Sequence, residues 1–198
     1  MENISIIMQQ FFTNTLPKNT LKLANKLQNS QPTFLNNFYL TAGTALSLLL
    51  GHRESEDLDF FTQDKFEPQK LQQELETFGT LTDLELADGT LNTFIDGVKI
   101  SSKVDTACTK LQTIGVRGSK KDFIDLYFLL KEFSLEQLFD FLGEKYPKIN
   151  YNQIHILKSL TYFEDANEQP IPKMHIEISW EKVKKNIVEQ VKEFSFIS

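Results

Sequence analysis

The chain has 198 residues, of which 40% are hydrophobic and 24% are charged, and its formal net charge is −6 at pH 7. This length and balance predict a globular fold with one ample core, or one domain with a sizeable appendage, and they disfavour an intrinsically disordered chain. No apolar run approaches the roughly 18 residues that a membrane span needs. The N-terminus lacks the basic region of a signal peptide, and the single Cys108 fits a reducing cytoplasm.

The first forty residues have two kinds of apolar pattern. Residues 1–30 have apolar side chains at helical spacing, interrupted by Pro17. After a break, residues 38–41 form a short apolar run that predicts a buried strand. A helical segment followed by a strand is therefore expected at the start of the chain.

Gly43 and Thr44 follow this strand and form the predicted turn into a helix over residues 45–50. Glycine lets a ligand approach the backbone, and a threonine hydroxyl can cap a helix. The pair is a candidate anion cradle at a helix N-terminus. An ordinary strand-to-helix turn would use the same two residues.

A charged loop leads into a strand predicted over residues 57–62. Because strand side chains alternate between faces, Asp57 and Asp59 are expected on one face. Two adjacent carboxylates are unfavourable unless a cation lies between them, and Mg²⁺ prefers oxygen ligands. The alternative is an exposed face with two solvated acids. The preceding Gly-Thr turn and the loop with Arg53 and Ser55 favour the metal site.

The middle of the chain predicts one helix and an antiparallel meander. Residues 66–78 have the pattern of an amphipathic helix. Residues 81–86, 90–95 and 98–101 read as strands, and an Asp-Gly pair joins each to the next, which is a strong hairpin signal. These strands most simply extend the sheet that carries Asp57 and Asp59.

The remainder of the chain is predicted to be helical. Ser119 and Asp122 match a capping box, with Asp in the usual position of Glu. Asp125 lies in a segment that is apolar on almost every face, so its carboxylate should be paired or bound to a cation, and Lys110 is one candidate partner. The expected helices span residues 105–113, 120–133, 135–142, 150–160 and 180–194.

Three blocks in this order resemble motifs of the nucleotidyltransferase AbiEii/AbiGii toxin family. The first runs from Gly43 through Arg53 and Ser55 to Phe61, and contains Asp57-Leu58-Asp59. The second contains Lys110 and continues through residues 117–127, and the third spans residues 160–181. The resemblance covers the chain from about residue 35 onward.

The resemblance implies an α+β, polymerase-β-like nucleotidyltransferase fold. A nucleotidyltransferase-like domain with a small mixed sheet and flanking helices is expected over residues 1–103, and a helical region packed against it over residues 104–198. It also implies a cytoplasmic, Mg²⁺-dependent enzyme that transfers a nucleoside monophosphate from an NTP to an acceptor, with tRNA as one acceptor. Such a protein would be the toxin of a toxin–antitoxin pair, with a cognate antitoxin as partner.

Site roles also follow from the resemblance. Asp57 and Asp59 would hold Mg²⁺ and, with Lys110 and Asp125, would form the catalytic set. The nucleotide-binding set would comprise Gly43, Thr44, Arg53, Ser55, Lys110 and Asp122.

Two departures from the family pattern bear on activity. Ala42 stands where the family usually has the first Gly of a Gly-Gly-Thr, and it would restrict the backbone if that position needs a positive φ. The strand predicted at residues 98–101 has no acid where a third carboxylate is expected, and Asp96 lies at a hairpin turn. The alternative is therefore a catalytically impaired member that binds a nucleotide or a partner. A structural domain without nucleotide affinity is a third, plainer interpretation.

One local basic patch stands out in this acidic chain. Arg117, Lys120 and Lys121 lie close together and are a candidate RNA contact. By composition alone, such a group is more often a solvated loop. RNA as the acceptor therefore rests on the family resemblance.

Overall fold

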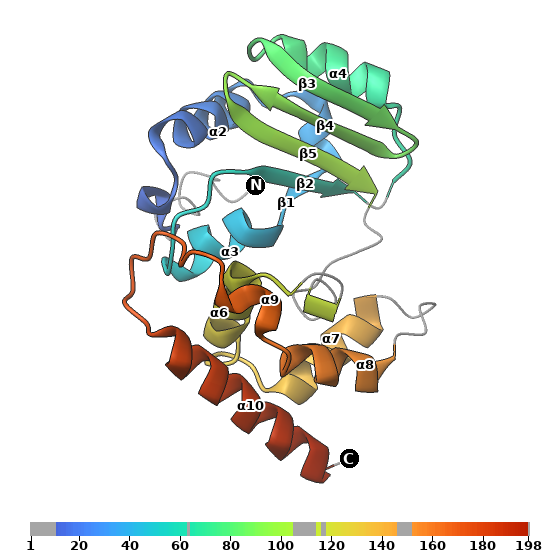
Figure 1. The fold of residues 1–198 in the computed structure, drawn as a ribbon. Coiled ribbons are helices and arrows are strands. Elements are labelled where there is room, and N and C mark those ends of the chain that lie inside the picture. The colour runs from blue at the N-terminus through green and yellow to red at the C-terminus, as the bar shows by residue number, and fades with distance from the viewer. Residues whose placement is uncertain (1–10, 63, 105–113, 116–117, 146–151, 198) are drawn as a thin grey trace. The chain divides into compact units, whose positions relative to one another are not determined.

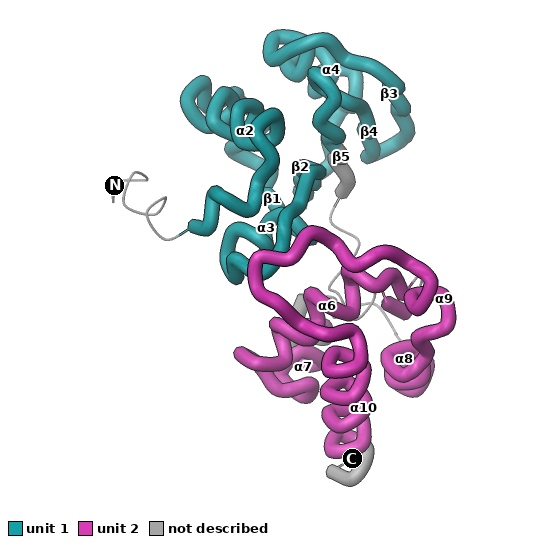
Figure 2. Tube along the Cα trace, turned by 60° about the vertical axis from the view of Figure 1, so that its left-hand side comes forward, with its two compact units in different colours: residues 1–106 teal, residues 107–198 magenta. Residues whose placement is uncertain are grey.

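The computed structural model describes residues 11–62, 64–104, 114–115, 118–145 and 152–197. The chain divides into two compact units, residues 1–106 and residues 107–198 (Figure 2). The helix predicted over residues 105–113 lies outside the described residues, and the domain boundary expected after residue 103 stays a prediction. No helix in the described part combines the length and apolar character needed to cross a membrane.

The first unit is built on a five-stranded mixed sheet in the order β1-β2-β5-β4-β3 (Figure 1). β2 pairs with β5 in parallel, and the other pairs are antiparallel. The mixed sheet with flanking helices confirms the predicted α+β, nucleotidyltransferase-like class. The elements are η2 (Thr13–Thr15), α2 (Lys18–Ser30), η3 (Thr33–Asn36), β1 (Tyr39–Leu40), α3 (Ala42–Leu50), β2 (Leu58–Thr62), α4 (Pro68–Glu76), β3 (Leu81–Ala87), β4 (Thr90–Ile95) and β5 (Val98–Val104).

The predicted meander is confirmed, with β3 one residue and β5 three residues longer than expected. At the β3–β4 turn Gly89 has a φ of 62°, and at the β4–β5 turn Asp96 and Gly97 have φ of 49° and 81°. Positive φ at both central residues, as at Asp96 and Gly97, is what a type I′ hairpin turn requires. β5 continues to Val104 because its parallel ladder with β2 extends to the pair Thr62–Val104. The strand predicted to end at residue 101 therefore ends three residues later.

One face of the sheet carries the core of the first unit. Leu58 and Phe60 of β2 are buried in a cluster that also contains Leu23 of α2 and Leu75 of α4. Since neighbouring residues of a strand face opposite sides, Asp59 points away from this core. The fold thus places the metal-site candidate on the face opposite α2 and α4.

The second unit is helical in its described part. Phe123, Phe163 and Trp180 form an aromatic cluster, with ring centroids 4.9 to 5.9 Å apart. One helical turn, α9, lies in the segment between the predicted helices 150–160 and 180–194. The elements are α6 (Lys120–Leu129), α7 (Leu135–Lys145), α8 (Gln153–Leu160), α9 (Glu164–Asn167) and α10 (Trp180–Ile197).

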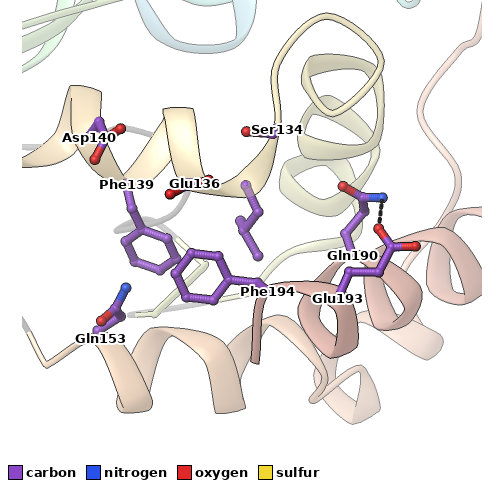
Figure 3. Close-up of a pocket in the computed structure, with 9 residues that line it drawn as sticks. Ser134, Glu136, Phe139, Asp140, Gln153, Gln190, Glu193 and Phe194 are labelled. Atoms are coloured by element: carbon purple, nitrogen blue, oxygen red, sulfur yellow. Dashed lines mark hydrogen bonds between the residues drawn. The ribbon is translucent and has the colours of Figure 1, made fainter. Parts of the chain in front are cut away.

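A cavity of about 310 Å³ opens between α7, α8 and α10 within this unit (Figure 3). Phe139 of α7 and Phe194 of α10 stack in it, with ring centroids 5.2 Å apart and planes 29° apart. Both rings belong to the lining, and their offset stack joins α7 to the last turns of α10.

Candidate nucleotide and metal site

The helix α3 begins three residues earlier than its sequence pattern predicts. Its first residue is Ala42 and its N-cap is Thr41, whose side chain makes no capping hydrogen bond. Gly43 and Thr44 therefore lie in the first helical turn and are not a turn before it, and Thr44 is not the cap. Because the first N–H groups of a helix have no intrahelical acceptor, this end of α3 can receive an anion.

Ala42 has a φ of 56°, so the position does adopt the left-handed conformation that the sequence left open. A residue with a Cβ atom pays about 1–2 kcal/mol there relative to right-handed backbone. The chain enters α3 through this strained residue, two residues after the end of β1.

The close approach of the Arg53 side chain leaves no room for a Cβ atom at Gly43. A Cβ atom at this position would lie 2.6 Å from Arg53 Nη2 and 3.3 Å from Ser55 Oγ. Arg53 is only 3% exposed, and its Nη1 donates to the carbonyl of Glu54 at 2.8 Å. The guanidinium thus packs directly against the first turn of α3 and brings positive charge to the helix end that can receive an anion.

Thr44 connects the same turn to the loop before β2. Its buried hydroxyl donates to the carbonyl of Asp57 and is 2.8 Å from Ser55 Oγ. The structure thus brings together five residues that the sequence singled out separately: Gly43, Thr44, Arg53, Ser55 and Asp57. The hydroxyl groups of Thr44 and Ser55 bind one another, and that of Thr44 also binds the backbone, so both hydroxyls help to position the loop before β2.

Two residues that sequence reasoning missed hold the loop from its other side. Thr20 of α2 donates from its hydroxyl to the carbonyl of Glu56 at 2.9 Å, and the carbonyl of Thr15 accepts from the N–H of Ser55 at 3.1 Å. Both threonines are buried. The available signal was the spacing of Thr20 with Leu23 and Leu27 on one helix face, since a polar residue on a buried face needs a partner.

Asp57 lies immediately before β2 and Asp59 lies within it, and both residues are half-buried. The carbonyl of Asp59 accepts from the N–H of Thr41 at 2.9 Å, which ties β2 to the residue before α3. Within the described residues, the carboxylate of Asp57 has no hydrogen bond or ion pair. Asp57, which has no donor among the described residues, and Asp59, two residues further on, have the carboxylate oxygens that a hard divalent cation such as Mg²⁺ prefers.

The neighbouring strand brings no acid to this face. The Cα atom of Asp59 pairs with that of Ser101 in β5, and no residue of β5 is acidic. Asp96 accepts a 3.2 Å hydrogen bond from the N–H of Thr80 at the β4–β5 turn, as its sequence position predicts. Across the described ranges, no group of three or more His, Cys, Asp or Glu residues could hold a metal ion.

The other predicted site residues belong to the second unit. Asp122 and Asp125 of α6 are both fully buried, and Asp125 interacts with other residues of the chain. Ser119 is the N-cap of α6, and its hydroxyl donates to the carboxylate of Asp122. The capping box is therefore altered, because the hydroxyl binds the carboxylate in place of the backbone N–H. Lys110 lies outside the described residues, so its role stays a prediction.

Lys120 is a structural residue, which corrects the expected basic patch. It is 6% exposed, and its ammonium donates to the carbonyl of Asn167 at 3.0 Å and to that of Gln169. It also lies 5.3 Å from the ring centroid of Trp180. Lys121 is exposed, and Arg117 lies outside the described residues. Lys120 is thus committed to the interior of the second unit and cannot contribute to an RNA-binding surface.

Comparison with known proteins gives one family and one related protein. A family model described as "Nucleotidyl transferase AbiEii toxin, Type IV TA system" matches residues 26–95, which include the whole described site of the first unit from Thr41 to Asp59. The "Uncharacterized protein aq_aa25" of Aquifex aeolicus (strain VF5) is 34% identical over 186 residues, which cover 80% of this chain and 88% of that protein. No solved structure matches the chain.

Proposed function

We propose, from the premise that this chain belongs to the AbiEii nucleotidyl transferase toxin family, that it transfers a nucleoside monophosphate from an NTP to an acceptor in a Mg²⁺-dependent reaction. RNA, with tRNA as the first class to test, is the proposed acceptor. The proposed biological role is that of a toxin with a cognate antitoxin, acting in the cytoplasm.

The reaction forms one bond and breaks another at the α-phosphorus. An acceptor hydroxyl oxygen attacks the α-phosphorus and loses its proton, the α–β anhydride bond breaks, and pyrophosphate leaves. Such transfer needs in-line positioning and neutralisation of phosphate charge more than covalent help. Mg²⁺ bound by Asp57 and Asp59 would supply much of that neutralisation.

The chain's own groups have distinct proposed tasks. The N–H groups of the first turn of α3, at Ala42 and Gly43, would bind phosphate oxygens. Arg53 would fix that turn and add positive charge. Lys110 and Asp125 remain proposed members of the catalytic set, and Asp122 remains a proposed nucleotide-binding residue from the resemblance.

One observation carries this proposal. The loop that ends in Asp57 is tied by the Thr44 hydroxyl to the first turn of α3, so the backbone of a proposed cation ligand is held at a helix end that could receive a phosphate. A phosphate chelated by a cation on Asp57 would therefore be adjacent to the open N–H groups. An ordinary structural turn does not need a half-buried carboxylate that has no donor among the described residues.

The test is transfer of label from each of the four NTPs, labelled at the α-phosphate, to total RNA in the presence of Mg²⁺. Wild-type protein is expected to label RNA, and Asp57→Asn or Asp59→Asn should lower the rate by about 10²–10³-fold. Asp64→Asn is the matched control, because this exposed acid follows β2. Absence of transfer by the wild type with every NTP would overturn the proposal.

A second candidate function is supported by the register of β5. With Ser101 opposite Asp59 and no acid in that strand, a second metal ion lacks a strand carboxylate. The chain would then bind an NTP without turning it over. Calorimetry distinguishes the two candidates: an NTP that binds with measurable heat but gives no labelled RNA supports the binding module and excludes the transferase.

A further inference from the structure

We infer that Thr20 of α2 is a positioning residue for the cation site, acting through the backbone of the loop that carries Asp57. This inference rests on the proposed function and concerns a residue outside the family match at residues 26–95. Thr20 is one of three buried threonines that bind the loop before β2, and we name these three the threonine clamp: Thr15, Thr20 and Thr44.

The clamp holds three consecutive residues of the loop. The carbonyl of Thr15 accepts from the N–H of Ser55 at 3.1 Å, the hydroxyl of Thr20 donates to the carbonyl of Glu56 at 2.9 Å, and the hydroxyl of Thr44 donates to the carbonyl of Asp57. These bonds come from different elements, because Thr15 ends η2, Thr20 lies in α2 and Thr44 lies in α3. The loop backbone is therefore fixed from both sides immediately before the first carboxylate.

The two proposed cation ligands need different supports. Asp59 lies inside β2, where ladder hydrogen bonds to β1 and β5 fix its backbone. Asp57 precedes Leu58, the first residue of β2, so it lies outside that ladder. Two carboxylates can share a cation only if both are held in place. The clamp fixes the backbone at Asp57, as the sheet ladder fixes the backbone at Asp59.

Thr20 is the member of the clamp that can be tested most cleanly. Thr44 lies in the proposed phosphate-binding turn, and Thr15 acts through its backbone. Thr20 is 2% exposed and contributes one hydroxyl to one carbonyl. Valine has nearly the shape of threonine, so Thr20→Val removes the hydrogen bond with little change of packing volume.

The chain offers a closely matched control in the same unit. Thr93 of β4 is 1% exposed, and its hydroxyl donates to the carbonyl of Thr82 at 2.9 Å. Thr93→Val therefore removes a hydrogen bond of the same type, length and burial on the β3 side of the sheet. Both variants should lower the urea midpoint by a similar amount, because each leaves one carbonyl without its donor.

The experiment uses Mn²⁺ as the probe, with its free concentration measured from its paramagnetic resonance signal. Thr20→Val is expected to weaken Mn²⁺ binding by about tenfold or more, whereas Thr93→Val should leave it at the wild-type value. Thr20→Ser keeps the hydroxyl and should restore the affinity. Hydrogen exchange at the amides of residues 55–58 should accelerate in Thr20→Val alone.

The possible results separate this inference from the proposed function. Equal Mn²⁺ affinities for Thr20→Val and Thr93→Val would overturn the positioning role even if the wild type transfers nucleotides. A wild type that binds Mn²⁺ but labels no RNA would overturn transfer, and the Thr20 variants would still decide the positioning role. A wild type that binds no Mn²⁺ would overturn both.

Discussion

The N-termini of α3 and α6 both follow an extended Ser or Thr residue, but their polar groups are used differently. α6 has an acid in its first turn, Asp122, which suits the positive end of the helix dipole, and the N–H of Lys120 donates to Gln169 Oε1 at 2.9 Å. α3 has no acid in its first turn and no side-chain cap. The end of α6 is thus satisfied by its own unit, while that of α3 is compatible with a bound anion. The N-terminus of α6 therefore has a structural role, whereas the N-terminus of α3 is a candidate anion-binding site.

The largest effect that sharpens this comparison is expected from Lys120→Met. Loss of the buried ammonium leaves the carbonyls of Asn167 and Gln169 without their donor and removes the contact with Trp180. The free energy of unfolding in urea should fall by about 2–3 kcal/mol. Lys121→Met, at the exposed neighbour, should change it by less than about 0.5 kcal/mol. Equal stabilities for the two variants would show that Lys120 is not structural.

Gly43→Ala tests the close packing of Arg53 against the first turn of α3. The new Cβ atom would meet Arg53 Nη2 at 2.6 Å, so the buried guanidinium must shift. Unfolding free energy should fall by about 1–2 kcal/mol, and NTP affinity measured by calorimetry should fall with it. Gly115→Ala is the matched control, because its Cβ atom would have only an ordinary 3.8 Å contact with Ile156. A similar loss in both variants would exclude the Arg53 contact as the cause.

Ser119→Ala and Thr41→Ala compare the two N-cap side chains directly. The Ser119 hydroxyl donates to Asp122, so its removal should cost about 1 kcal/mol in urea unfolding. The Thr41 side chain makes no capping hydrogen bond, so its removal should cost less than about 0.5 kcal/mol. A larger loss for Thr41→Ala would mean that α3 is capped by its own side chain and is not held open.

The smallest expected effect belongs to Ala42→Gly. Glycine removes the strain at a φ of 56° but loses more entropy on folding, so the free energy of unfolding should rise by about 0.5 kcal/mol. Ala45→Gly, later in α3, should lower it by about 1 kcal/mol because it relieves no strain. A decrease in both variants would show that Ala42 is not strained in solution.

How far the sequence could predict this molecule depends on how local each signal is. The strand β4 was predicted at its observed bounds, because an Asp-Gly pair on each side sets its ends. The start of α3 was predicted three residues late, because Gly43 and Thr44 look like turn residues and nothing in the sequence marks Ala42 as left-handed. That Asp57 and Asp59 share a face stays a prediction from alternation, because β2 begins at Leu58 and leaves Asp57 outside the strand.

The misses in the site involve partners that are distant in the sequence. Lys120 and Lys121 are adjacent in the sequence, but only Lys120 is buried. The orientation of α6 and the carbonyls of Asn167 and Gln169 decide this. Likewise, Thr20 and its partner Glu56 are 36 residues apart in the sequence, with β1 and α3 between them. Short-range patterns cannot identify such hydrogen bonds, so residues that support a site are harder to predict than residues that line it.

The parallel pairing of β2 with β5 has a consequence for the order of folding. The hairpins β3–β4 and β4–β5 close over two-residue turns, whereas β2 meets β5 only after the intervening α4 and meander have folded back. Contacts between distant segments form later because closing a long loop costs more entropy. We therefore expect the meander to assemble first and the two aspartates to be brought into place last. Pulse-labelled hydrogen exchange during refolding should protect β4 before β2, so that the candidate metal site is completed only in an otherwise folded sheet.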